Sequence, residues 1–241
     1  GRRFFDLRHE VNTRPDSMAQ CVSAALAAPA GPVTIADTGD NAGGGAPSDS
    51  TFFLAHLLEN DVQHAAIATI WDPVAVSLCQ DAGMGATLDL RIGGKIGPAS
   101  GAPVDVRATV IGLADDVLQH LGGTAVSMGA CAAVKVHPRG EAADPSRPES
   151  GIDVILSQKR KQTFEPTIFS ELGVDPGRKH ILVVKSTQHF HAAFAPISAR
   201  ILYAGDCGAL TGDMRSIPYR HVDTLRFWPF VEDPFAPADQ K

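Results

Sequence analysis

The chain has 241 residues, of which 44% are hydrophobic and 20% are charged, so it can bury a substantial core. Its formal net charge of −6 argues against a general nucleic-acid-binding protein, because phosphate contacts need a basic face. No apolar run approaches the roughly 20 residues that span a bilayer. We therefore expect a globular protein that contacts neither nucleic acid nor membrane.

The cysteine pattern bounds the cellular setting. The four cysteines lie far apart and include no CxxC pair; they are Cys21, Cys79, Cys131 and Cys207. Neither a zinc knuckle nor a dense disulfide framework is indicated. This usage is typical of a reduced environment, so we expect a cytoplasmic protein.

The first third of the chain alternates between helical and strand patterns. The expected elements are a helix at 16–28, a strand at 33–36, a helix after 51, a strand at 65–71 and a helix that starts at 72–73. Asp16 or Ser17 would cap the first helix, Ser48 or Asp49 the second, and Asp72 the third. This order favours a parallel or mixed sheet with helices packed on it.

The middle of the chain has a different pattern. Residues 87–92 and 104–111 alternate between apolar and polar side chains, as half-exposed antiparallel strands do. We expect an antiparallel insertion at about 86–135. A polar, proline-rich segment at about 138–151 follows, and it predicts an exposed loop.

The α/β pattern then returns. It predicts strands at 152–157, 181–184 and 200–204, with helical turns at 166–172 and 188–197. The apolar run at 181–184 is typical of a central parallel strand. The predicted fold is α/β, with a mixed, largely parallel sheet flanked by helices and an antiparallel β insertion in the middle of the chain.

A glycine-rich loop at 37–51 is the first candidate site. It follows a predicted strand and carries several polar groups; they are Asp37, Asp40, Asn41, Gly43, Gly44 and Asp49. Glycines let backbone N–H groups approach a ligand, and carboxylates at the carboxyl end of a strand are well placed in an open α/β sheet. A structural turn capped by the carboxylates explains the same residues. The spacing matches neither a P-loop nor a dinucleotide fingerprint.

A second candidate site follows the predicted central strand. Lys185 and Ser186 end this strand, and His189 and His191 come soon after. A lysine here can bind a carboxylate, and a histidine can act as an acid or base near neutral pH. For His191, a surface or core position is the simpler interpretation.

Six segments in order resemble one known family. They are DTGDNAGGGAPSDST (37–51), IWDPVAV (70–76), LRIGGKIGP (90–98), QTFEP (162–166), LGVDP (172–176) and VVKSTQHFHAAFAPI (183–197). Together they resemble the C-terminal domain of the MlrC-like (microcystinase C-like) zinc metallopeptidases. The likeness covers nearly the whole chain from about residue 15.

The resemblance implies a function in a larger, two-domain protein. Zinc would be bound by an N-terminal domain of that protein and not by this chain, so we expect no metal ligands here. Residues 1–15 would be a linker from that domain, and residues 16–241 would form the C-terminal domain. The substrates would be small linear peptides or amides, as in microcystin degradation. This chain alone would then not be active.

The resemblance also suggests roles for residues of the two candidate sites. Asp37, Asp40 and His189 would be catalytic. The substrate-binding residues would be Asn41, Gly43, Gly44, Asp49, Lys185 and Ser186. Which of Asp37, Asp40 and Asp49 faces the cleft stays open. The alternative is a non-catalytic module that binds ligands or braces a structure such as a homodimer.

Overall fold

The computed structural model describes residues 1–11, 15–136 and 151–236, and it divides the chain into two compact units. One unit combines residues 1–14 with 211–241, and the other comprises residues 15–210. The exposed loop expected at about 138–151 lies almost wholly outside the described residues. In the described part of the chain, no helix has the length and apolar character needed to cross a bilayer.

The smaller unit joins the two ends of the chain. Helices α1 (Arg2–Asp6) and α2 (Arg8–Val11) occupy residues that the sequence suggested were a linker. Arg2 pairs with Asp233 at 2.7 Å. The Phe5 ring packs edge-on against Phe235, with 5.3 Å between ring centroids. These contacts hold the described part of the C-terminal segment to the N-terminal helices.

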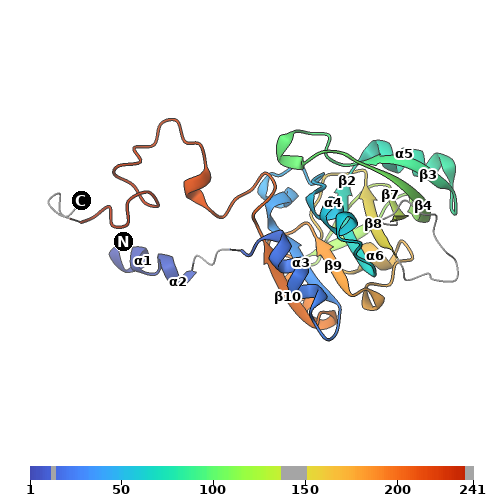
Figure 1. Ribbon diagram of the computed structural model, residues 1–241, viewed down its shortest axis with the longest axis horizontal. Coiled ribbons are helices and arrows are strands. Elements are labelled where there is room, and N and C mark those ends of the chain that lie inside the picture. The colour runs from blue at the N-terminus through green and yellow to red at the C-terminus, as the bar shows by residue number, and fades with distance from the viewer. Residues whose placement is uncertain (12–14, 137–150, 237–241) are drawn as a thin grey trace. The chain divides into compact units, whose positions relative to one another are not determined.

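An eight-stranded mixed sheet forms the centre of the larger unit, with strand order β10-β1-β9-β2-β8-β7-β4-β3 (Figure 1). The parallel strands are β1 (Val33–Asp37), β2 (Ala65–Trp71), β8 (Ile152–Ser157), β9 (Ile181–Val184) and β10 (Arg200–Ala204). The antiparallel strands are β3 (Thr87–Ile92), β4 (Val104–Ala114) and β7 (Cys131–Val136). The predicted fold class is confirmed.

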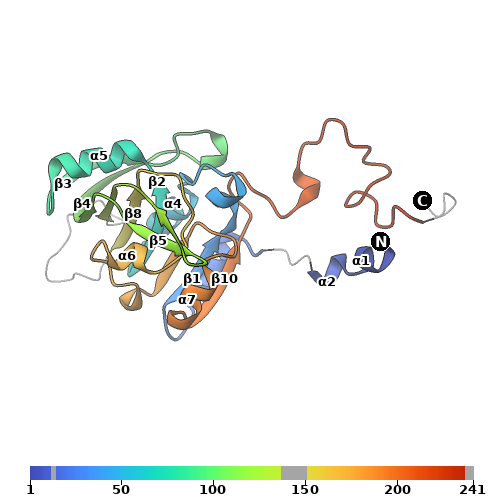
Figure 2. The ribbon, with the colours of Figure 1, turned by 180° about the vertical axis from the view of Figure 1, so that it is seen from behind.

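Helices cover both faces of this sheet (Figure 2). One face packs against α3 (Met18–Leu26), α4 (Phe52–Glu59) and α5 (Pro73–Ala82). The other packs against α6 (Thr167–Ser170) and α7 (His191–Phe194). Strand β9 is buried along its whole length because helices lie on both sides of it.

The helix starts show which capping predictions were correct. Ser17 forms a capping box with Gln20 at the start of α3. Asp72 accepts a hydrogen bond from the Ala75 backbone and so caps α5. The prediction that Ser48 or Asp49 caps α4 was wrong. The N-cap of that helix is Thr51, whose side chain makes no capping bond.

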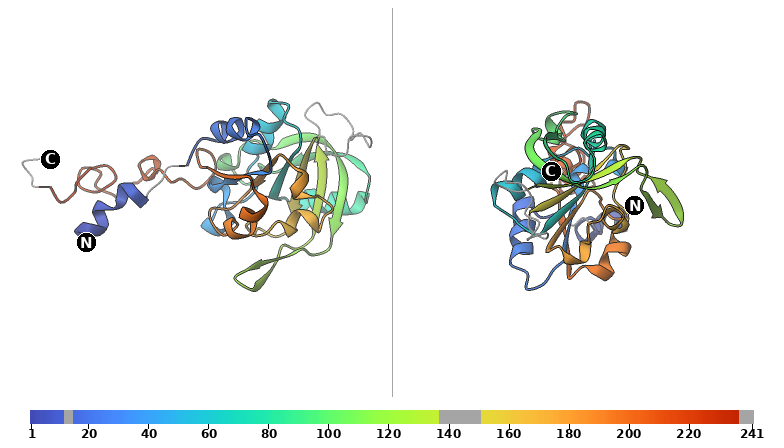
Figure 3. Two further views of the ribbon diagram at one scale, coloured as in Figure 1. Left: turned by 90° about the horizontal axis from the view of Figure 1, so that it is seen from below. Right: turned by 90° about the vertical axis from the view of Figure 1, so that its right-hand side faces the viewer.

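The antiparallel insertion carries a small hairpin of its own. Strands β5 (Leu118–Leu121) and β6 (Thr124–Ser127) form a separate two-stranded sheet that extends away from the main one (Figure 3). Gly122 and Gly123 make its turn with φ of 55° and 84°. A two-residue hairpin turn of this kind needs positive φ at both positions, which glycine adopts readily.

Candidate functional site

The carboxyl ends of the central parallel strands bring the two candidate segments together. Strand β9 lies between β1 and β2, and Ala36 of β1 pairs with Val184 of β9. Asp37 follows Ala36 and Lys185 follows Val184, so these two side chains meet at the sheet edge. Lys185 Nζ lies 2.9 Å from Asp37 Oδ2 and 3.0 Å from Asp40 Oδ2. We call Asp37, Asp40 and Lys185 the carboxyl-end cluster.

Asp40 organises the glycine-rich loop. Its Oδ1 accepts a hydrogen bond from the Ser48 backbone N–H at 2.8 Å, and its Oδ2 accepts one from Ser50 at 2.7 Å. Asp40 is fully buried, and so are Asp37 and Lys185. The loop therefore folds around a carboxylate whose two oxygens are both bound by protein donors.

Burial and the charges of the carboxyl-end cluster together shift the pKa values of two of its members. Burial raises the pKa of Asp37, and the neighbouring carboxylate of Asp40 adds to this, although Lys185 opposes it. Burial by itself would lower the pKa of Lys185, but Asp37 and Asp40 outweigh burial and raise that pKa. The two shifts have different dominant causes, because burial outweighs the lysine at Asp37, whereas the two carboxylates outweigh burial at Lys185.

A second set of contacts ties the loop to the segment after β9. Asn41 Nδ2 donates to Thr187 Oγ1 at 2.8 Å, and Asn41 Oδ1 accepts from the Gly43 backbone at 2.9 Å. Gln162 Nε2 lies 2.8 Å from His189 Nδ1 and 3.3 Å from Ser186 Oγ. Three separate pieces of the sequence thus converge at this edge of the sheet: the glycine-rich loop, the segment after β9 and Gln162.

Asp49 lies in a different environment from Asp40. It accepts hydrogen bonds from the Lys95 and Ile96 backbones and from the Ser100 hydroxyl. The Lys95 ammonium turns to Asp72 at 2.6 Å. Asp49 therefore fastens the segment that follows β3, and Lys95 is a neighbour that sequence reasoning missed.

Accessibility separates the candidate residues into two groups. The exposed ones are Gly43, Gly44 and His189. The buried ones are Asp37, Asp40, Asn41, Asp49, Lys185 and Ser186. We call Gly43, Gly44, Thr187 and His189 the rim, because these exposed residues adjoin the buried cluster. His191 is half-buried and begins α7.

Two further residues at this edge had no predicted role. Gln162 follows β8 and was noted only as part of the QTFEP segment. Arg160 Nη1 donates to the Ala46 carbonyl at 2.6 Å, so it braces the glycine-rich loop. A polar run directly after a strand is the only signal in the sequence that points to either residue.

The carboxyl-end cluster does not fit a metal ion. The carboxylate of Asp40 accepts hydrogen bonds from two backbone N–H groups and pairs with Lys185. The Lys185 ammonium also pairs with Asp37 Oδ2, so a cation already occupies the space between the two carboxylates. Over residues 1–11, 15–136 and 151–236, no group of three or more His, Cys, Asp or Glu side chains is arranged to hold a metal. Cys207 lies near this cluster, and burial raises the pKa of its thiol to about 12.

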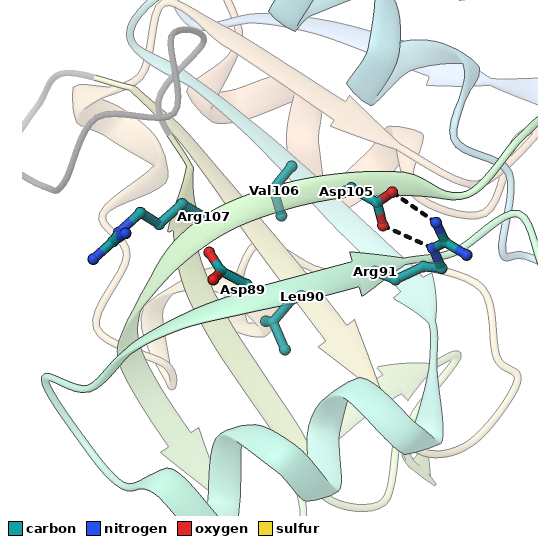
Figure 4. Close-up of a pocket in the computed structure, with 6 residues that line it drawn as sticks. All are labelled: Asp89, Leu90, Arg91, Asp105, Val106 and Arg107. Atoms are coloured by element: carbon teal, nitrogen blue, oxygen red, sulfur yellow. Dashed lines mark hydrogen bonds and ion pairs between the residues drawn. The ribbon is translucent and has the colours of Figure 1, made fainter.

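A shallow pocket of about 390 Å³ lies elsewhere, on strands β3 and β4 (Figure 4). Its lining residues are Asp89, Leu90, Arg91, Asp105, Val106 and Arg107. Arg91 and Asp105 form an exposed ion pair across the two strands at 2.7 Å. The pocket contains none of the candidate residues, so it adds nothing to the site at the carboxyl ends of the strands.

Comparisons with known proteins show what this chain is similar to. Residues 35–221 match a family model described as MlrC C-terminus. Microcystinase C from Sphingomonas sp. is 36% identical over 214 residues, which is 89% of this chain and 39% of that protein. The crystal structure of a candidate metallopeptidase from Mesorhizobium sp. BNC1 gives a TM-score of 0.73 at 21% identity, over 94% of this chain and 43% of that one. The structural likeness shows a shared fold. The chain spans about two fifths of the length of each relative.

Proposed function

Because residues 35–221 match its model, the chain belongs to the MlrC C-terminus family, and we propose that it forms the C-terminal part of a metallopeptidase. The substrates would be small linear peptides or amides. The observation that supports a site is the convergence of the glycine-rich loop, the end of β9 and Gln162 at one edge of the sheet. In an open α/β sheet, ligands bind beyond the carboxyl ends of the strands.

The roles divide according to exposure. His189 is exposed and would contact the substrate, and the exposed backbone of Gly43 and Gly44 would allow the substrate to approach closely. Asp37, Asp40 and Lys185 are buried and bind one another, so they would position the loop without touching the substrate. Asn41 and Ser186 would connect the loop and His189.

The metal would come from another part of a longer protein. A metal of a peptidase polarises the scissile carbonyl and activates water when it is bound. Zinc is the metal that we propose, held by an N-terminal domain. The residues of this chain would bind and orient the peptide against that domain, within a cytoplasmic enzyme.

The test compares this chain alone with the same chain joined to an N-terminal domain of the family. Both are purified without chelator, and metal content and hydrolysis of short linear peptides are measured. The proposal expects about one zinc per molecule in the longer protein alone, as in a catalytic site with three protein ligands. It also expects His189→Ala to lower kcat of the longer protein at least about 100-fold, the usual contribution of acid–base or donor groups. Stoichiometric metal in the short chain, or no hydrolysis by the longer one, would contradict it.

A second candidate function is structural. In it, the domain binds ligands without chemistry or braces a larger assembly, such as a homodimer. The observation that favours it is that the carboxylate oxygens of Asp40 and Asp49 already accept hydrogen bonds from groups of the protein itself. In that case, His189→Ala leaves kcat of the longer protein unchanged.

A further inference from the structure

Gln162 joins the pieces of the candidate site through its side-chain amide. The residue follows β8 and is 4% exposed. Its Nε2 lies 2.8 Å from His189 Nδ1 and 3.3 Å from Ser186 Oγ, and its Oε1 lies against Gly43. One amide therefore contacts the glycine-rich loop, the end of β9 and the histidine of the rim.

The direction of the hydrogen bond fixes the proton of His189. An amide nitrogen only donates, so Nδ1 of His189 must accept. A neutral imidazole carries one proton, so that proton sits on Nε2. Within the described residues, Nε2 has no hydrogen-bond partner, and the side chain is exposed. His189 thus offers an N–H donor to whatever lies outside.

Two contacts hold this geometry in place. A Cβ on residue 43 would lie 1.9 Å from Gln162 Oε1, so only glycine leaves room for the amide. The ring of Phe164 lies beside the imidazole, with 6.2 Å between ring centroids. Gly43 therefore confines the Gln162 amide, and Phe164 confines the His189 imidazole, in addition to the hydrogen bond between them.

We propose that Gln162 is a positioning residue that holds His189 as the Nε2–H tautomer. His189 then donates a hydrogen bond to a carbonyl or carboxylate oxygen of a peptide, and it neither takes up a proton at Nδ1 nor binds a metal there. This inference rests on the proposed function, because it names the atom through which His189 acts. It also gives Gly43 a role, which is to leave space for the Gln162 amide.

Nitrogen-15 NMR of the histidine rings in this chain tests the tautomer without any activity assay. Spectra are recorded near pH 8, where an ordinary imidazole with a pKa of about 6.5 is neutral. The signal of His189 is assigned by its loss in His189→Asn. In the unaltered chain, Nδ1 should give a pyridine-type signal and Nε2 a pyrrole-type one. In Gln162→Glu, the carboxylate can only accept, so Nδ1 should become pyrrole-type.

Gln188→Glu is the matched control, since it adds the same charge on the exposed residue next to His189. It should leave the tautomer unchanged. In the longer protein, Gln162→Glu should lower kcat about 10- to 100-fold, as losses of orienting partners do. The inference is overturned if Nδ1 is pyrrole-type in the unaltered chain, or stays pyridine-type in Gln162→Glu. Neither result depends on turnover, so each is distinct from a failure of the proposed function.

Discussion

Two buried groups of lysine and aspartate lie at opposite ends of the parallel strands, and each group connects different parts of the chain. At the carboxyl ends, Lys185 binds Asp37 and Asp40. At the amino ends, Asp153 of β8 binds Lys135 of β7 at 2.5 Å and Lys179, just before β9, at 2.6 Å. We call the second group the amino-end cluster. All six side chains are at most 8% exposed.

A buried ion pair does not by itself mark a site. The amino-end cluster links β8 to β7 and to the residues before β9, and Lys135 pairs directly with Asp153 in the sheet register. The carboxyl-end cluster continues through Asp40 into the glycine-rich loop, which carries Gly43 and Gly44 to the surface. The two clusters therefore differ in their connection to exposed groups and not in the burial of their charges.

Lys185→Met should have the largest effect. It leaves Asp37 and Asp40 buried without their cation, and breaking a buried pair in this way costs about 3–5 kcal/mol. Urea unfolding of the variant, followed by circular dichroism, measures the loss. Lys95→Met is the matched control, because the Lys95 side chain is 36% exposed and its ion pair is partly screened. An equal loss of unfolding free energy in the two variants would contradict the view that burial makes the Lys185 ion pairs costly to break.

Asp153→Asn should cost less, roughly 2 kcal/mol, which is typical of a lost hydrogen bond to a charged group. The reason is that two lysines on long, flexible stems can turn toward water more easily than two aspartates can. In the longer protein, kcat per folded molecule should stay unchanged. A large fall in kcat with intact folding would show that the amino-end cluster also serves the site.

The pH dependence of stability distinguishes Asp37 from an exposed aspartate. Burial raises the pKa of Asp37 above its unfolded value of about 3.9, so the folded protein holds this proton more tightly. The stabilisation is complete below about pH 3.9 and is lost as the pH rises through the folded value. Asp37→Asn cannot titrate, so urea midpoints of the unaltered chain should fall relative to this variant as the pH rises from about 4.

Asp105→Asn is the control for that measurement and has the opposite sign. The hydrogen bond from Arg91 lowers the pKa of Asp105, so its contribution is present above about pH 3.9 and is lost as the pH falls. At neutral pH, Asp37→Asn should change the unfolding free energy by no more than about 1.5 kcal/mol, because the amide still accepts from Lys185. Parallel curves for the two variants would refute the assignment.

The meeting of Asp37 and Lys185 could be predicted from the sequence, because both follow apolar strands and parallel strands end at one edge. The amino-end cluster could not. Asp153 and Lys135 lie inside strands, so their contact depends on a register that the local pattern does not contain. The role of Gln162 could not be predicted for a similar reason, because it depends on how the chain after β8 crosses the sheet edge.

The fold shows the same division between local and long-range information. The caps at Ser17 and Asp72 are local patterns, and both formed as expected. Asp49 also looked like a cap, but it binds Lys95, Ile96 and Ser100, about fifty residues away along the chain. Short polar residues favour several backbone partners, and tertiary structure decides among them.

Asn41→Ala should have the smallest effect on stability and tests the link between the cluster and the rim. Asn41 bridges the glycine-rich loop to Thr187, and losing such hydrogen bonds costs about 1 kcal/mol. If the carboxyl-end cluster acts through this loop, amide hydrogen exchange should quicken at residues 42–46 and 187–189 and stay unchanged around Asp153. Thr187→Val removes only the bridge to the second segment, so it should loosen residues 187–189 and leave the loop protected. Faster exchange at both ends of the sheet would mean that the two clusters form one cooperative unit, and the contrast between them would then be one of position alone.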